Sequence, residues 1–302
     1  MEKRSIIHMF DPMPHNSPFD INMAMDAGFD ILMPYCNVKL ENINALTQDT
    51  IFSRGAAGVK RTAIFIGGRD LLLAIEMLEV CKRAMVSPFD ISVFTDPSGA
   101  FTTAAALVAC VEQQLLIHHA AQLKDQKVVI FGGTGPVGSA TGIIASLAGA
   151  QTILVDHLSL DNAEEVAKTY NRRFSANLQG ACARNDEEKM TLLATADVVL
   201  STAKAGVQVL NAAVLKNLTQ VKVAGDVNAV PPLGIEGIKR KDAGEPLLYA
   251  VNAAGAVGVG ALAVGDVKYQ LQHKLLQLLL TTEQPVYLDF RIAFEQAREI
   301  LR

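Results

Sequence analysis

The sequence lacks the residue patterns that a metal or disulfide protein needs. Its four cysteines, Cys36, Cys81, Cys110 and Cys182, lie far apart in 302 residues and show no CxxC spacing. Buried free thiols are therefore expected, and not a disulfide framework or a zinc site. The six histidines show no HxxxH or HExxH spacing, so no metal is predicted.

Long apolar runs and an excess of positive charge are also missing. No uninterrupted apolar stretch reaches the roughly twenty residues that a bilayer-spanning helix needs, so no membrane partner is expected. The opening residues, MEKRSIIHMFDPMPH, reach Asp and Pro too early for a signal peptide, which favours a cytoplasmic protein. A formal net charge of −4 argues against nucleic acid as a partner, because binding a phosphate backbone needs a basic face.

Apolar residues, by contrast, make up 50% of the chain, enough for a large core and roughly two domains. Short strand-like runs alternate with longer helical stretches; the runs are SIIHMF (5–10), FDILMPY (29–35), TAIFIGG (62–68) and DISVFTD (90–96). This alternation predicts an α/β fold with a parallel sheet.

The chain makes a second start near its middle. A polar connection, Gln122–Lys127, precedes a fresh strand at Val128–Phe131, which places a domain boundary near His118. The pattern predicts an α/β domain on the substrate side at 1–118, a Rossmann-type dinucleotide-binding domain at 119–269, and C-terminal helices at 270–302 that return to the first domain.

The most informative stretch is a glycine cluster between that strand and an alanine-rich helix. The GxGxxG pattern covers six residues expected to bind a dinucleotide: Gly133, Thr134, Gly135, Pro136, Val137 and Gly138. The first glycine permits the tight turn, the second removes a Cβ that would block the pyrophosphate, and the third lets helix and strand pack closely. Pro136 suits the first helical position, where the free N–H groups attract phosphate.

Asp156 ends the next predicted strand, where an acidic side chain would bind the adenosine ribose. The following segment, His157–Glu165, has no Lys or Arg for a 2′-phosphate, so NAD is expected to be accepted at least as well as NADP. Spacing alone leaves open a glycine turn that serves only helix packing, with Asp156 opening a helix.

Two later loops follow predicted strands, STAKAG (201–206) and GDVNAVPPLGI (225–235). Loops at the carboxyl ends of strands border the ligand crevice in such sheets. Thr202, Ala203, Asp226 and Asn228 are therefore candidate contacts for the nicotinamide end of the cofactor, with turns of no further function as the alternative.

Three segments extend the evidence beyond the fold: 51–68, 94–106 and 225–238. Together with GGTGPVGSA they resemble the NAD(P)-dependent methylene-tetrahydromethanopterin dehydrogenases of one-carbon metabolism over nearly the whole chain. The resemblance implies a two-domain subunit that transfers hydride reversibly from methylene-tetrahydromethanopterin to NAD(P)+, giving the methenyl form in formaldehyde oxidation. It also implies no metal or flavin, and a homo-oligomer, a trimer or hexamer.

The resemblance assigns Lys268, in GALAVGDVKYQLQ, to the lysine that faces the substrate cleft and orients the substrate. Asp96, Thr102 and Thr103 end a strand and open a helix; they would pair with the aminopyrimidinone edge of a pterin, or only cap the helix. Arg54 would meet a negatively charged substrate tail, or belong to a solvated charged face.

The sequence shows no Ser/His/Asp, Cys/His or paired-carboxylate arrangement. Hydride loss from a carbon between two nitrogens needs no such set, because the nitrogen lone pairs stabilise the cation that is left. Two alternatives remain. One is a methylene-tetrahydrofolate or shikimate-type dehydrogenase with Lys39 as general acid/base, and the other is a non-catalytic NAD(P)-sensing regulatory protein.

Overall fold

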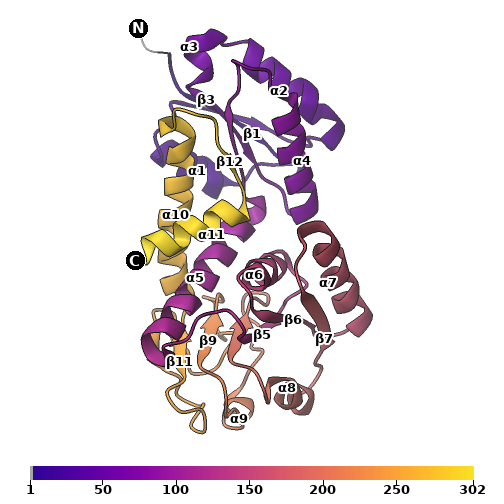
Figure 1. Ribbon diagram of the computed structural model, residues 1–302, viewed down its shortest axis with the longest axis vertical. Coiled ribbons are helices and arrows are strands. Elements are labelled where there is room, and N and C mark those ends of the chain that lie inside the picture. Colours follow the sequence, from indigo (N-terminus) through magenta and orange to yellow (C-terminus); the bar gives the residue numbers. More distant parts are fainter. Residues whose placement is uncertain (1–2) are drawn as a thin grey trace. The chain divides into compact units, whose positions relative to one another are not determined.

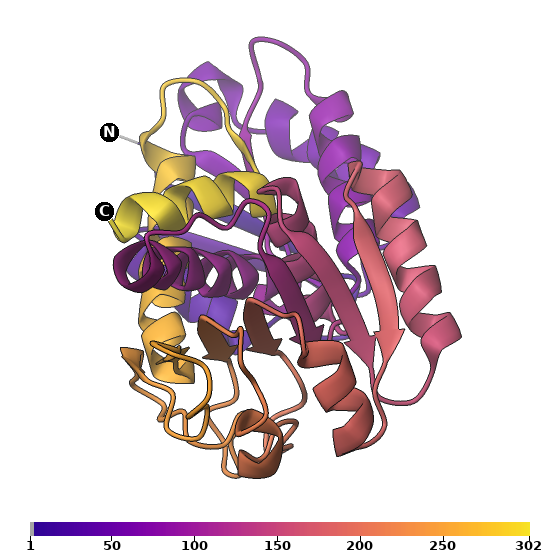
Figure 2. The same ribbon diagram turned by 60° about the horizontal axis from the view of Figure 1, so that its bottom comes forward.

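The computed structural model describes residues 3–302, with the backbone alone at 56 and 57. The chain divides into two compact units, Met1–Thr102 with Tyr269–Gln296 and Thr103–Lys268 with Ala297–Arg302. Each unit has its own sheet with helices packed on it (Figures 1 and 2). The predicted α/β fold with parallel sheets in two units is confirmed.

The first unit is built on a five-stranded parallel sheet in the order β12-β4-β3-β1-β2. Its elements are β1 Ile6–Phe10, α1 Pro18–Asp26, β2 Ile31–Tyr35, η1 Leu40–Asn42, α2 Ile43–Phe52, α3 Gly55–Val59, β3 Thr62–Ile66, α4 Leu71–Ala84, β4 Ser92–Thr95, η2 Pro97–Gly99 and β12 Tyr287–Leu288.

Helix α4 shows how local sequence sets an element of this unit. The Asp70 carboxylate caps it by accepting hydrogen bonds from the main-chain N–H groups of Leu72 and Leu73, at 2.9 and 3.0 Å. Lys82 and Arg83 in the last turn complement the helix dipole. Its apolar side then packs with α2 on one face of the sheet (Figure 1).

The second unit holds a seven-stranded sheet in the order β10-β11-β9-β8-β5-β6-β7, parallel except for β10. Its elements are β5 Lys127–Phe131, α6 Pro136–Leu147, β6 Gln151–Asp156, α7 Leu160–Phe174, β7 Leu178–Cys182, α8 Asp186–Leu193, β8 Val198–Ser201, α9 Ala212–Leu215, β9 Val223–Asp226, β10 Ala243–Pro246 and β11 Val257–Val259.

Chain order in this sheet reverses at β5, which lies between β6 and β8. That is the doubly wound arrangement, and its ligand crevice lies outside the carboxyl ends of the strands where the order reverses. The alternating side chains of β5 and β6 pack on both faces; Val129, Phe131, Ile153 and Val155 join the apolar core beneath α8 and α9.

The unit boundary lies at Thr102/Thr103, whereas the sequence pattern suggested His118. It falls inside α5, Ala100–His119, because Leu107 and Val111 pack close to Gly225 of β9. Helix α10, Ala261–Thr281, and helix α11, Phe290–Ile300, are divided in the same way. Short strands β10, β11 and β12 were not predicted.

The described cysteines are all free thiols. Burial raises the pKa of Cys81 to about 11 and that of Cys110 to about 12, whereas Cys36 is exposed and Cys182 half-buried, unlike the expected burial.

Within residues 3–302, one helix, Pro97–His119, is apolar and long enough to span a membrane, but 72% of its most apolar 18-residue window is buried, as in a core helix.

Candidate dinucleotide site

The turn between β5 and α6 is packed so closely that three of its glycines are required by the protein itself. A Cβ at Gly132, whose φ is +71°, would lie 2.7 Å from the main-chain nitrogen of Ala203. A Cβ at Gly133 would lie 2.8 Å from the Cα of Leu154, and one at Gly138 only 2.2 Å from the Gly132 carbonyl oxygen. These contacts are with backbone, which cannot move aside cheaply.

Gly135 is different. Its φ of −78° and ψ of 168° suit any residue, and a Cβ there would meet nothing closer than the Gly132 carbonyl oxygen, at 3.4 Å. Nothing within the described chain therefore requires glycine here. Gly135 is the N-cap of α6, with the exposed Pro136 following it, so its missing side chain leaves open the approach to a helix N-terminus. An open helix N-terminus after a strand is where the pyrophosphate binds in dinucleotide folds, which favours dinucleotide binding over a turn that serves packing alone.

The loop after β8 is fastened to this turn. The Thr202 hydroxyl lies 2.9 Å from the Phe131 carbonyl oxygen and 3.2 Å from that of Gly132, and it donates its proton there. Ala203 supplies the backbone against which Gly132 packs. The structure thus brings Thr202 and Ala203 to the glycine turn, as expected for two strands that are neighbours in the sheet.

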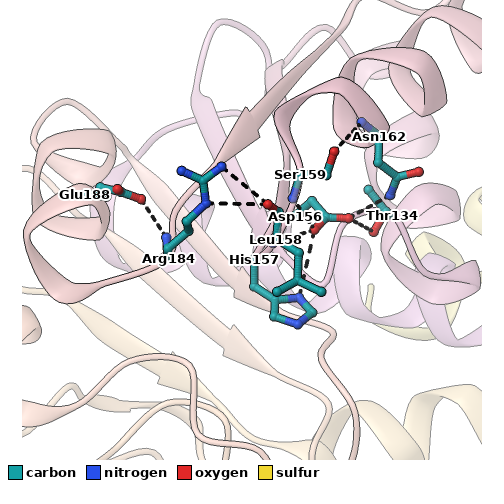
Figure 3. A network of polar contacts seen from close by, with 8 residues as sticks. All are labelled: Thr134, Asp156, His157, Leu158, Ser159, Asn162, Arg184 and Glu188. Atoms are coloured by element: carbon teal, nitrogen blue, oxygen red, sulfur yellow. Dashed lines mark hydrogen bonds and ion pairs between the residues drawn. The ribbon is translucent and has the colours of Figure 1, made fainter.

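Asp156, the last residue of β6, has a carboxylate that accepts four hydrogen bonds (Figure 3). One oxygen accepts from the main-chain N–H groups of Leu158 and Ser159, at 2.7 and 3.1 Å. The other accepts from Asn162 Nδ2 at 2.7 Å and from the Thr134 hydroxyl at 3.2 Å. Burial favours the protonated form, but these donors outweigh it and lower the pKa to about 2, so the group is an anion at neutral pH.

Asp226 and Asn228 organise the loop after β9. The buried Asp226 carboxylate accepts from the main-chain N–H groups of Asn228 and Ile235, at 3.0 and 3.1 Å, and burial raises its pKa. Asn228 accepts from Gly206 and Val230 and donates to the Pro232 carbonyl oxygen. Both side chains position the loops that follow β8 and β9; a direct contact with cofactor remains a prediction.

Arg184 was missed by the sequence reasoning. It follows β7, and its Nε and Nη2 each lie 3.4 Å from the carbonyl oxygen of Leu158, in the turn that Asp156 organises (Figure 3). The segment directly after β6, where the sequence analysis expected a basic residue for NADP, contains none. In a doubly wound sheet the third strand pairs with the second, so the first basic residue after that strand was the available signal.

In the first unit, Asp96 and Thr102 are brought together at the carboxyl end of β4. The fully buried Asp96 carboxylate accepts from the main-chain N–H groups of Phe101 and Thr102, at 2.9 and 3.1 Å, and from the Thr102 hydroxyl at 2.6 Å. These bonds fix the start of α5, which is the helix-capping alternative. A substrate contact by either residue remains a prediction.

The other substrate-side candidates are more dispersed. Arg54 donates to the Arg4 carbonyl oxygen, beside the amino end of β1, whereas ligands of parallel sheets bind at the carboxyl ends. Thr103 is half-buried on α5, and Lys268 is half-buried on α10 in the second unit. Lys39, the general acid/base of the alternative, is exposed, with its Nζ 3.8 Å from a Glu41 carboxylate oxygen.

Sequence reasoning also passed over groups at the carboxyl edge of the first sheet. Asp11 follows β1, and burial raises the pKa of its carboxyl group. A Cβ at Gly67, after β3, would lie 2.6 Å from an Asp11 oxygen, so the two loops need glycine to meet. Beyond β2, a hollow of about 410 Å³ is lined by Tyr35, Asn37 and other residues as far as Asp49.

Comparison with known proteins identifies the family. The chain is 44% identical to the NAD(P)-dependent methylenetetrahydromethanopterin dehydrogenase of Methylorubrum extorquens, over 98% of this chain and 99% of that protein. The chain belongs to the methylenetetrahydromethanopterin dehydrogenase family. The family model described as "Methylene-tetrahydromethanopterin dehydrogenase, N-terminal" matches residues 18–98. A second Methylorubrum extorquens relative, named Bifunctional protein MdtA, is 31% identical over 98% of this chain and 99% of its own length.

Solved structures share the fold of this methylenetetrahydromethanopterin dehydrogenase family member. Shikimate 5-dehydrogenase from Listeria monocytogenes superposes with a TM-score of 0.53 at 15% identity, covering 99% of this chain and 96% of that one. The 5-ketofructose reductase of a Gluconobacter strain gives a TM-score of 0.50 at 15% identity, covering 99% of both chains. At such low identity the likeness concerns the fold alone.

The two kinds of glycine in the turn predict opposite phenotypes. Gly135→Ala should keep the melting temperature within about 2 °C of wild type, because its Cβ clashes with nothing in the protein, but raise the Kd for NAD+ at least about tenfold. Gly138→Ala is the matched control: forced against a backbone oxygen, it should lower the free energy of unfolding by about 1–3 kcal/mol. Calorimetric titration and thermal unfolding measure both. An unchanged Kd in Gly135→Ala would mean that phosphate does not approach this residue.

Proposed function

We propose that the chain is an oxidoreductase that transfers hydride reversibly between methylene-tetrahydromethanopterin and NAD(P)+, producing the methenyl form. The observation that carries this proposal is 44% identity, over 98% of the chain, to a dehydrogenase named for this substrate and cofactor. The structure supports the proposal at Gly135, because no contact within the described chain requires glycine at this position.

The chemistry makes modest demands on side chains. The methylene carbon lies between two nitrogens, so departure of a hydride leaves a delocalised amidinium cation and no proton has to be removed. When bound, the nicotinamide ring supplies the hydride acceptor. The task of the protein is then to hold donor and acceptor carbons about 3–3.5 Å apart and to exclude water. No general base is needed for that step.

Each part of the site has a role in this arrangement. The turn at Gly133–Gly138 and the first N–H groups of α6 would bind the pyrophosphate. Asp156 would accept the ribose hydroxyls, and the loops positioned by Thr202, Ala203, Asp226 and Asn228 would border the nicotinamide. All of these residues belong to the second unit, at the carboxyl ends of neighbouring strands.

We further propose that NAD is accepted at least as well as NADP. The Asp156 carboxylate is ionised, and a 2′-phosphate close to it would be repelled. At an effective dielectric constant of about 20, two unit charges about 4 Å apart interact by roughly 4 kcal/mol before screening. Even a fraction of this repulsion, left after screening, is enough for tenfold discrimination against NADP. The measurement is kcat/KM with each cofactor; a clearly higher value with NADP would refute this preference.

On the substrate side, Lys268 is proposed to orient the pterin, with Asp96, Thr102, Thr103 and Arg54 as further candidates. Lys268→Ala should lower kcat/KM for the pterin about ten- to a hundredfold, the effect of losing one charge-assisted hydrogen bond, and leave the Kd for the dinucleotide nearly unchanged. Lys274→Ala, on the same helix, is the control. Unchanged kinetics in folded Lys268→Ala protein would make this lysine a surface residue only.

Isotope transfer tests the reaction itself. Deuterium placed on the methylene carbon should appear in the reduced nicotinamide, detected by mass spectrometry, and NADH should form at 340 nm without an essential general base. Deuterium lost to solvent would contradict direct transfer. Faster turnover with methylene-tetrahydrofolate than with methylene-tetrahydromethanopterin would leave the mechanism standing and overturn the substrate.

The family resemblance also supports a cytoplasmic homo-oligomer, a trimer or hexamer, as a proposal. Analytical ultracentrifugation of the purified protein measures the assembly, and a monomer at micromolar concentration would refute it.

A further inference from the structure

We propose that Arg184 determines the use of NADP. Its guanidinium would bind the 2′-phosphate, and so allow a site built around Asp156 to accept NADP as well as NAD. The inference rests on the proposed function, and it concerns a residue that follows β7, whereas the proposed ribose-binding acid, Asp156, ends β6.

Strand pairing places Arg184 close to Asp156 at the carboxyl edge of the sheet. β6 and β7 run parallel, and Asp156 is paired with Cys182 in their register. Arg184, two residues further on, therefore lies beside the turn that follows Asp156. The two long contacts from its guanidinium to the Leu158 carbonyl oxygen, both 3.4 Å, place it against this turn (Figure 3).

The guanidinium remains available to an anion. Arg184 is exposed, and within residues 3–302 no ion pair engages its side chain. Five N–H donors are present and only two point at Leu158, so the fork that matches phosphate oxygens has free donors. Its backbone is fixed separately: the main-chain N–H of Arg184 donates to Glu188 Oε2 at 2.7 Å, and Asn185 caps α8. The side chain is thus held near the turn without being neutralised there.

The surroundings of Asp156 make such a second charge useful. The Asp156 carboxylate already accepts hydrogen bonds from the main chain of Leu158 and Ser159 and from the side chains of Thr134 and Asn162. They hold the acid in place and offset part of its charge. A 2′-phosphate placed near this acid still needs a cation, and His157–Glu165 provides no Lys or Arg. Arg184 is a basic side chain in contact with the same turn.

Direct binding tests the proposal without turnover. Calorimetric titration with NADP+ and with NAD+ is carried out on wild type, Arg184→Gln, Arg184→Lys and Arg172→Gln. Arg184→Gln should raise the Kd for NADP+ about ten- to a hundredfold, as expected for a lost charge-assisted contact, and change the Kd for NAD+ less than about twofold. Arg184→Lys should recover part of the loss, because it keeps the charge but not the fork.

Arg172→Gln is the matched control. It removes the same charge from an exposed position in the last turn of α7, about 18 Å along the helix from its start at Leu160, and should affect neither cofactor. The fragment 2′,5′-ADP, compared with 5′-AMP, repeats the test on the phosphate alone. Should Arg184→Gln fold poorly, Arg184→Lys with these fragments decides the question.

The outcomes separate this inference from the proposed function. Equal weakening of NAD+ and NADP+ would mean that Arg184 stacks on adenine or maintains the turn, and would overturn the inference. Unchanged NADP+ binding, or a wild type that binds NAD+ but no NADP+, would overturn it as well and leave the dehydrogenase function intact. A wild type that binds neither dinucleotide would overturn both.

Discussion

Close approach of main chains at the β5–α6 turn is the constraint on which the rest of the site depends. Gly132 touches the backbone at Ala203, and Gly133 touches the backbone of Leu154, so the turn is wedged between the ends of β6 and β8. Side chains at these positions would push the three strand ends apart. Because the strands meet so closely, the N-terminus of α6, Asp156 and the Thr202 loop lie together at the carboxyl ends of the strands, which is where dinucleotides bind in doubly wound sheets.

The same crowding sets the electrostatics of Asp156. Thr134 reaches its carboxylate from the glycine turn and Asn162 reaches it from α7, so elements on either side of β6 share one anion. Burial would favour the protonated form, and the low pKa exists only because the donors are held in place. The charge state of Asp156 is therefore a property of the network around it, and a single acidic residue in the sequence describes only part of that network.

What could be predicted from the sequence follows from how local each feature is. The glycine turn and Asp156 lie within one strand–turn–helix–strand segment, and its pattern correctly predicted the fold class and indicated the proposed cofactor region. Arg184 depends on the pairing of β6 with β7, which adjacent residues do not encode. The unit boundary inside α5 was equally hidden, because Leu107 and Val111 belong to a continuous apolar helix whose two parts pack on different units. A strand as short as β12 is defined only by its pairing with a neighbouring strand, which the local sequence does not show.

The first unit shows why an acid at a strand end is ambiguous until its partners are known. Asp96 and Asp11 both follow a strand of the same parallel sheet, so their positions in the sequence look equivalent. Asp96 is fully buried, and three donors from Phe101 and Thr102 use its oxygens to start α5. Asp11 accepts main-chain hydrogen bonds from Met13 and Gly68, and burial keeps the pKa of its carboxyl group raised. A carboxyl group that accepts from two main-chain donors retains more lone pairs for polar groups of a ligand than one whose oxygens accept three hydrogen bonds at the start of a helix.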